Sequence, residues 1–126
     1  MTEVISTKTA PAAIGPYSQA IKAGDFLYAS GQNPIIPETG ELCTGDIKAQ
    51  ADQAIRNAGE ILKAAGLTYA DVVKTTCFLA DMGDFGAFNE VYGGYFTGKP
   101  ARSCVAVKTL PKNVLCEVEV IAYCGK

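Results

Sequence analysis

An arginine and a glutamate on two apolar runs near the end of the chain are the side chains best suited to chemistry. Arg102 opens the strand predicted at residues 102–108, and Glu117 lies on the strand predicted at 115–123. Because successive side chains of a strand point to opposite faces, Arg102 shares a face with Cys104. We expect the two strands to form a hairpin, which would bring the arginine close to the glutamate.

The pairing of Arg102 with Glu117 allows two interpretations. The first is a structural ion pair at an interface. The second is an anion-binding site, because the planar guanidinium matches a carboxylate through two parallel hydrogen bonds. This pairing becomes stronger where water is scarce. A site of this second kind would bind a small carboxylic acid.

Five further residues could contribute to such a site, and each also has a structural interpretation. Tyr17 follows a Gly-Pro turn and either packs locally or covers a ligand. Ser30 and Gly31 end a predicted strand, where a serine usually stabilises a turn but can also contact a ligand. Asn89 stands among aromatic residues of a predicted helix and needs hydrogen-bond partners. Cys104 is a nucleophile or an inert thiol, and a chain without histidine favours the inert thiol.

The composition argues against several classes of function. The chain has 11 basic and 13 acidic residues, a net charge of -2, and no basic run, so we expect no nucleic-acid partner. We expect no membrane span, because no apolar stretch approaches about 18 residues. We expect no signal peptide, because residues 1–10 lack a basic segment followed by an apolar one. The absence of histidine and of CxxC pairs predicts no metal site. Five scattered cysteines predict reduced thiols and a cytoplasmic protein.

Two helices are predicted. Residues 46–65 carry an apolar stripe of helical period, with Asp46 suited to cap the start and Gly66 suited to the left-handed position after the end. Residues 84–97 place a second, aromatic stripe on one face. With no repeat and no linker, we expect a single domain over residues 1–126.

The strands complete an α+β prediction. A hairpin is expected at residues 17–31 and a β-branched strand at 71–80, in addition to the two strands near the end of the chain. We therefore expect a mixed or antiparallel sheet of about six strands, with two helices on one face.

Several predicted strands are apolar on both faces, although two helices can cover only one. The apolar residues of both faces are Val72, Val73, Cys77, Phe78, Leu79, Val105, Ala106, Val107, Val118, Val120, Ile121 and Ala122. A sheet with one solvated face should instead alternate apolar and polar residues. We expect the second face to be covered by further copies of the chain, as in a homo-oligomer.

Four segments carry a family resemblance. They are APAAIGPYSQA (10–20), YASGQNPIIPETGEL (28–42), FNEVYGGYF (88–96) and PARSCVAVKTLPKNVLCEVEVIA (100–122). In this order and spacing they resemble the RidA family, the YjgF-type reactive intermediate deaminases. The nearest subgroup is the 2-iminobutanoate/2-iminopropanoate deaminases.

The resemblance implies a fold, an assembly and a reaction. The fold is chorismate-mutase-like, or ferredoxin-like, and three copies form a homotrimer with a central barrel and a cleft at each subunit interface. The reaction is the hydrolysis of reactive 2-imino or enamine acids to 2-oxo acids and ammonia, without metal or cofactor. The partners implied are thus small 2-imino and 2-oxo carboxylic acids.

The resemblance also implies roles for the candidate residues. Arg102 matches the arginine that holds the substrate carboxylate. Tyr17, Ser30, Gly31 and Asn89 match the pocket wall, and Cys104 and Glu117 match the positions that place the attacking water. Two alternatives remain open: a ligand-binding or chaperone-like trimer without turnover, and a ribonuclease or translation inhibitor, which the acidic composition disfavours.

Overall fold

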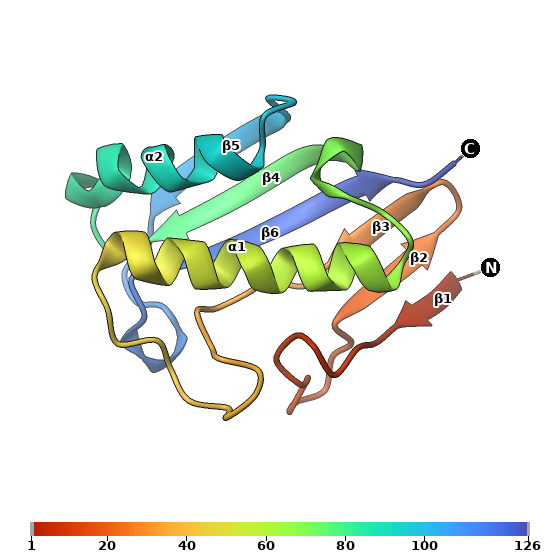
Figure 1. Cartoon of the computed structure of the whole chain (residues 1–126), viewed down its shortest axis with the longest axis horizontal. Helices are drawn as coiled ribbons and strands as arrows, with labels where there is room; N and C mark the ends of the chain where they lie inside the picture. The colour runs from red at the N-terminus through yellow and green to blue at the C-terminus, as the bar shows by residue number, and fades with distance from the viewer. Residues whose placement is uncertain (1, 126) are drawn as a thin grey trace.

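The computed structural model describes residues 2–125 and contains one six-stranded sheet with two helices on one face (Figure 1). The strand order is β1-β2-β3-β6-β4-β5. The elements are β1 Thr2–Ile5, β2 Ala20–Ala23, β3 Phe26–Ala29, α1 Ile47–Ala64, β4 Val72–Leu79, α2 Phe85–Tyr95, β5 Ala101–Ala106 and β6 Cys116–Tyr123. The α+β prediction, with a mixed sheet of about six strands, is confirmed.

Helix α1 lies within one residue of its predicted bounds because its signals are local. The Asp46 carboxylate accepts a hydrogen bond from the Ala49 N–H at 3.0 Å, and Gly66 takes a positive φ of 77° after the last turn. Between these ends, Ile55, Ile61 and Leu62 bury completely against the sheet. Their burial anchors the helix across the sheet as part of the hydrophobic core.

The first hairpin is confirmed, and one strand was missed. β2 and β3 pair antiparallel around a turn at Gly24, whose φ is 60°. No strand was predicted at the start of the chain, yet β1 pairs antiparallel with β2 and occupies one edge of the sheet. Its pattern is three exposed residues followed by a buried Ile5, which carries little of the alternation that identifies a strand.

The predicted hairpin between β5 and β6 is wrong. β4 lies between them, parallel to β5 and antiparallel to β6. Helix α2 connects β4 to β5, and a helical crossover of this kind brings its two strands together in parallel. The chain after β5 includes a 3-10 turn at Pro111–Asn113 before β6 enters the sheet on the other side of β4.

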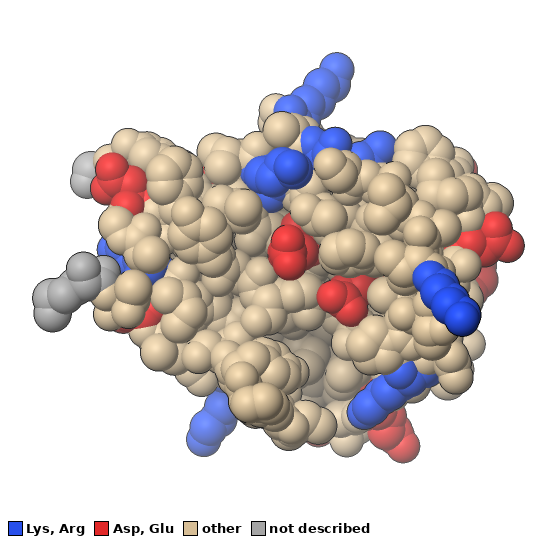
Figure 2. All heavy atoms as spheres, turned by 180° about the vertical axis from the view of Figure 1, so that it is seen from behind, with Lys and Arg blue, Asp and Glu red and all other residues tan. Residues whose placement is uncertain are grey.

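The two faces of the sheet differ sharply in exposure. On the helix side Thr75, Cys77 and Val118 are fully buried. On the opposite side Val73 is 43% exposed and Val105 is 47% exposed. Figure 2, which views the molecule from behind Figure 1, shows this side as a largely uncharged surface with acidic side chains near its middle. The apolar character of the second face is thus present, and its covering by further copies stays a prediction.

Candidate functional site

Arg102 lies on the edge strand β5, where it points to the helix side of the sheet and packs against α2. Its Nη1 donates a hydrogen bond to the Asn89 side-chain oxygen at 2.7 Å. The guanidinium carbon lies 4.7 Å from the centre of the Tyr92 ring and 5.3 Å from that of Phe85. The hydrogen bond and the ring contacts fix the orientation of the guanidinium while the residue stays partly exposed.

A hollow of about 580 Å³ opens beside this guanidinium. Its lining residues are Asn89, Tyr92, Gly93, Phe96, Thr97, Lys99, Pro100 and Arg102. They include two cationic side chains and, within the described part of the chain, no aspartate or glutamate. The hollow therefore favours an anion, and the guanidinium fork favours a carboxylate in particular.

Glu117 faces the other side of the sheet. It lies on β6 opposite Phe78 of β4, between Cys116 and Val118, which both bury on the helix side. Its carboxyl group lies against Gly31, and a Cβ atom at that position would overlap it. Partial burial, together with the nearby Glu119, raises the pKa of Glu117. A carboxyl group in this state is suited to exchange protons with a ligand or with water.

A second hollow, of about 380 Å³, lies at Glu117. Its lining residues are Pro11, Ala12, Ile14, Tyr17, Gln19, Gly31, Gln32, Asn33, Ile35, Pro111, Lys112 and Glu117. Tyr17 and Gly31 thus line the same hollow as Glu117, and their contact with a ligand stays a prediction. Tyr17 is 55% exposed, so its ring is free to cover a ligand or to contact another chain.

One chain therefore holds the candidate residues in two separate groups. Arg102 and Asn89 line the hollow on the helix side, and Glu117 lines the hollow on the opposite side with Tyr17. The expectation that Arg102 and Glu117 lie side by side is wrong, because β4 separates their strands and their side chains leave opposite faces. The structural ion pair between them is excluded within one chain.

Cys104 accompanies Arg102 but has the properties of an unreactive thiol. It lies opposite Cys77 in the register of β4 and β5, and its side chain is partly buried on the helix side. Both residues are free thiols. Burial raises the pKa of the Cys104 thiol, and the opposing effect of Arg102 is smaller. A thiol that stays protonated at neutral pH is a poor nucleophile. Its main chain, on an edge strand, is the part available to contact a ligand.

Ser30 has a structural role in this chain. Its hydroxyl donates a hydrogen bond to the Ser18 carbonyl at 2.6 Å, and its N–H donates to the Gln19 carbonyl at 2.9 Å. These bonds tie the end of β3 to the start of β2. A contact between Ser30 and a ligand stays a prediction.

Sequence reasoning missed several residues of both hollows. Thr97 and Lys99 line the hollow beside Arg102. Gln32, Asn33 and Lys112 line the hollow at Glu117. Lys99 and Lys112 both have positive φ, at 54° and 57°. The place of Lys99 next to the PARSC segment was an available signal, whereas the others depend on how distant loops come together.

Two further observations limit the kind of site. Among residues 2–125, no group of three or more histidine, cysteine, aspartate or glutamate side chains is arranged to hold a metal ion. Within the same residues, none of the helices has the length and apolar character needed to cross a membrane.

Comparison with known proteins places the chain in a family. A family model described as "Endoribonuclease L-PSP" matches residues 7–124. A RutC family protein of Pyrococcus horikoshii is 57% identical over 98% of this chain and 98% of its own length. A mouse protein named 2-iminobutanoate/2-iminopropanoate deaminase is 52% identical over 98% of this chain and 92% of its own length.

The solved structures agree. A crystal structure of E. coli TdcF with bound serine matches with a TM-score of 0.92 at 43% identity and covers 96% of this chain and 98% of that chain. The match thus extends over nearly the whole of both chains. The chain therefore belongs to the endoribonuclease L-PSP family, which is the YjgF or Rid family that its four sequence segments predicted.

Proposed function

We propose that this protein hydrolyses small 2-imino acids, such as 2-iminobutanoate and 2-iminopropanoate, to 2-oxo acids and ammonia. The observation that carries the proposal is the guanidinium of Arg102, held by Asn89 and Tyr92 beside a hollow without acidic lining. The name of the mouse relative supports the reaction. The serine bound by the E. coli relative is an α-amino acid, whose carboxylate is placed as in these imines.

We further propose that the complete site forms between two copies of the chain in a homotrimer. Arg102 and Glu117 leave opposite faces of one sheet, so one chain cannot bring both to the same small substrate. The exposed apolar face around Val73 and Val105 offers the surface for such an assembly. In a closed ring, the Arg102 hollow of one subunit would meet the Glu117 hollow of its neighbour.

The mechanism follows from these positions. Arg102 holds the substrate carboxylate through two hydrogen bonds and so orients the neighbouring imine carbon, which removes an entropic cost. Glu117 accepts a proton from a water molecule as the water oxygen bonds to that carbon. Glu117 returns this proton to the nitrogen as the C=N double bond opens, which gives a carbinolamine. Glu117 then takes the hydroxyl proton and passes it to the nitrogen, the C–N bond breaks as the C=O bond forms, and ammonia leaves the 2-oxo acid. Water is the only co-reactant in this sequence.

A coupled assay tests the proposal. A threonine dehydratase converts threonine to 2-iminobutanoate, which semicarbazide traps. Adding this protein in catalytic amount should reduce the trapped product and speed the appearance of 2-oxobutanoate. No effect at stoichiometric protein would favour the alternative of a ligand-binding or chaperone-like trimer without turnover.

The ribonuclease alternative is supported by names alone: that of the family model, and those of related solved structures such as an endoribonuclease so titled from Thermotoga maritima. In Figure 2 the lysines and arginines lie at the edges of the face, several of them together at the top, while acidic side chains lie near its middle, and the chain carries a net charge of -2. RNA binding relies on clustered cations that neutralise phosphates.

We propose a cytoplasmic enzyme, since all five cysteines are free thiols.

A further inference from the structure

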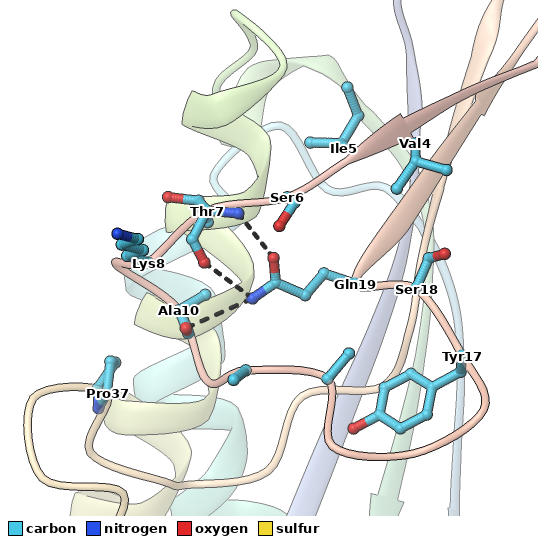
Figure 3. A pocket seen from close by; sticks show the side chains of 12 residues that line it. Val4, Ile5, Ser6, Thr7, Lys8, Ala10, Tyr17, Ser18, Gln19 and Pro37 are labelled. Atoms are coloured by element: carbon cyan, nitrogen blue, oxygen red, sulfur yellow. Dashed lines mark hydrogen bonds between the residues drawn. The ribbon is translucent and has the colours of Figure 1, made fainter.

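Gln19 stands out as a buried polar side chain that binds one loop at several points. The residue is 4% exposed. Its side-chain oxygen accepts a hydrogen bond from the Thr7 N–H at 2.7 Å, and its nitrogen donates to the carbonyls of Thr7, Ala10 and Pro11 at 3.1, 3.4 and 2.7 Å. Figure 3 shows the amide of Gln19 inserted into the bend of this loop. A flipped amide would turn its NH₂ toward the Thr7 N–H, so the contacts fix its orientation.

The loop that Gln19 binds carries Tyr17. The first leg of the loop, residues 7–11, is tied by the Gln19 amide, and the second leg is tied to the end of β3 by the two hydrogen bonds of Ser30. Between the two legs, Ala12, Ile14 and Tyr17 line the hollow that contains Glu117. Gln19 is thus the link that holds the two legs together.

Gln19 also lies between two hollows, which makes its hydrogen bonds more important for holding the loop. It lines the Glu117 hollow and also a neighbouring hollow of about 470 Å³ on the other side of the loop. With open space on both sides, packing alone does not hold the loop in place. Of residues 7–18, only Ala10 is buried in the core, so the amide hydrogen bonds supply much of what holds the loop in place.

We propose that Gln19 is a positioning residue, which holds the loop of residues 7–18 so that Tyr17 covers the substrate beside Glu117. This rests on the proposed function for its substrate, but the positioning of the loop does not. An apolar side chain of the same length would leave the Thr7 N–H and the Pro11 carbonyl without this partner. Unpaired buried groups of this kind favour local opening of the loop.

The test compares Gln19→Met with Gln50→Met. Gln50 is also a buried glutamine with two main-chain partners, since it accepts from the Leu115 N–H and donates to the Gly45 carbonyl, but it lines neither hollow. Amide hydrogen exchange, 2-oxobutanoate binding and steady-state kinetics are measured on both variants and on the unmodified protein. Gln19→Asn, which keeps the amide but shortens its reach, replaces Gln19→Met if that variant does not fold.

For Gln19→Met we expect amide exchange to quicken within residues 7–18 and not in α1. KM and the Kd of 2-oxobutanoate should rise roughly fivefold, while kcat changes by less than about twofold, because the loop contributes to binding rather than to bond making. For Gln50→Met neither constant should change by more than about twofold. In a Tyr17→Ala background, Gln19→Met should have little additional effect on KM, because both changes remove the same contact.

Two results would overturn the proposal. One is unchanged exchange in residues 7–18, and the other is a KM effect of Gln19→Met that is fully additive with Tyr17→Ala. A protein that exchanges as expected and binds 2-oxobutanoate but shows no turnover would instead count against the deaminase, since neither of those measurements requires catalysis.

Discussion

Arg102 is held in an orientation that its neighbours impose. Asn89 binds Nη1 from one side, and the rings of Tyr92 and Phe85 lie within cation–π distance of the guanidinium. A guanidinium held in this way loses little further freedom when it binds a carboxylate. This explains why an arginine stands at the start of a strand that otherwise carries small apolar residues.

Replacing Arg102 should therefore remove turnover. Arg102→Ala should lower kcat/KM by about 100-fold or more, a loss typical of removing a central charged donor. Arg102→Lys should recover little of it, because an ammonium group has no planar fork. Steady-state kinetics in the coupled assay measure both.

Arg56→Ala serves as the matched control. Arg56 lies on α1, is mostly exposed and pairs weakly with Asp52 at 3.5 Å. Its loss should change kcat/KM by less than about twofold. Full activity of Arg102→Ala on 2-iminobutanoate would contradict the assigned role of Arg102.

Glu117 should make the activity depend on pH. Its pKa is raised by burial and by Glu119, and only the ionised carboxylate can accept a proton from water. We expect kcat/KM to fall as the pH is lowered through this raised pKa. Glu117→Gln should abolish turnover at every pH.

The raised pKa of Glu117 also affects the stability of the folded protein. Because the pKa is higher in the folded protein, Glu117 favours folding below its unfolded pKa, and this contribution is lost as the pH rises through the folded pKa. Glu117→Gln should therefore leave the melting temperature at neutral pH unchanged or higher. Thermal melts across pH measure this, and a clear loss of stability at neutral pH would show that the ionised group is stabilised rather than strained.

At the scale of the elements, α1 supports the loop that follows β3. Asn57 of this helix is 1% exposed, and its side-chain nitrogen donates hydrogen bonds to the carbonyls of Asn33 and Ile35 at 2.9 and 2.8 Å. Both of those residues line the Glu117 hollow. The helix thus positions one wall of the candidate site through a single buried amide.

Asn57→Ala should destabilise the protein by about 1–3 kcal/mol, because it leaves the carbonyls of Asn33 and Ile35 without these partners. Lys48→Ala provides the comparison. It removes an exposed ion pair with Glu90 and should cost less than about 1 kcal/mol. Denaturant unfolding of both variants checks the difference, and equal effects would mean that the amide contributes no more than a surface ion pair.

The elements also show which parts of the fold can be read from the sequence. The start and end of α1 were predictable because Asp46 and Gly66 act on their own helix. The neighbours of β5 were not, because whether β4 or β6 lies beside it depends on contacts between distant segments. Because β5 and β6 follow each other in the sequence, a hairpin between them was the expected arrangement. The crossover through α2 instead places β4 beside β5.

The candidate site divides in the same way. Arg102 and Glu117 were identifiable by their residue types within apolar strands, and the roles we propose for them came from the family resemblance. The contact of Gly31 with Glu117 was not predictable from the residues, since it depends on how the segment after β3 lies across β6. The placement of Arg102 and Glu117 on opposite faces of the sheet likewise depends on the strand order, which the sequence alone did not predict.

At the scale of the whole molecule, a small chain presents two separate candidate hollows and one uncovered apolar face. The arginine hollow opens on the helix side, the glutamate hollow opens on the other side, and the surface around Val105 lies exposed. A ring of identical chains would cover the apolar face and complete each site by the same contact. The proposed assembly and the proposed reaction therefore depend on each other.

Subunit mixing tests this claim most directly. Arg102→Ala and Glu117→Gln should each be inactive alone, and the two are produced together so that they form mixed oligomers. If each site takes Arg102 from one chain and Glu117 from its neighbour, random mixing in equal amounts should restore about a quarter of the unmodified activity. No recovery in mixtures that sedimentation and mass measurements show to be mixed trimers would contradict a site shared between chains.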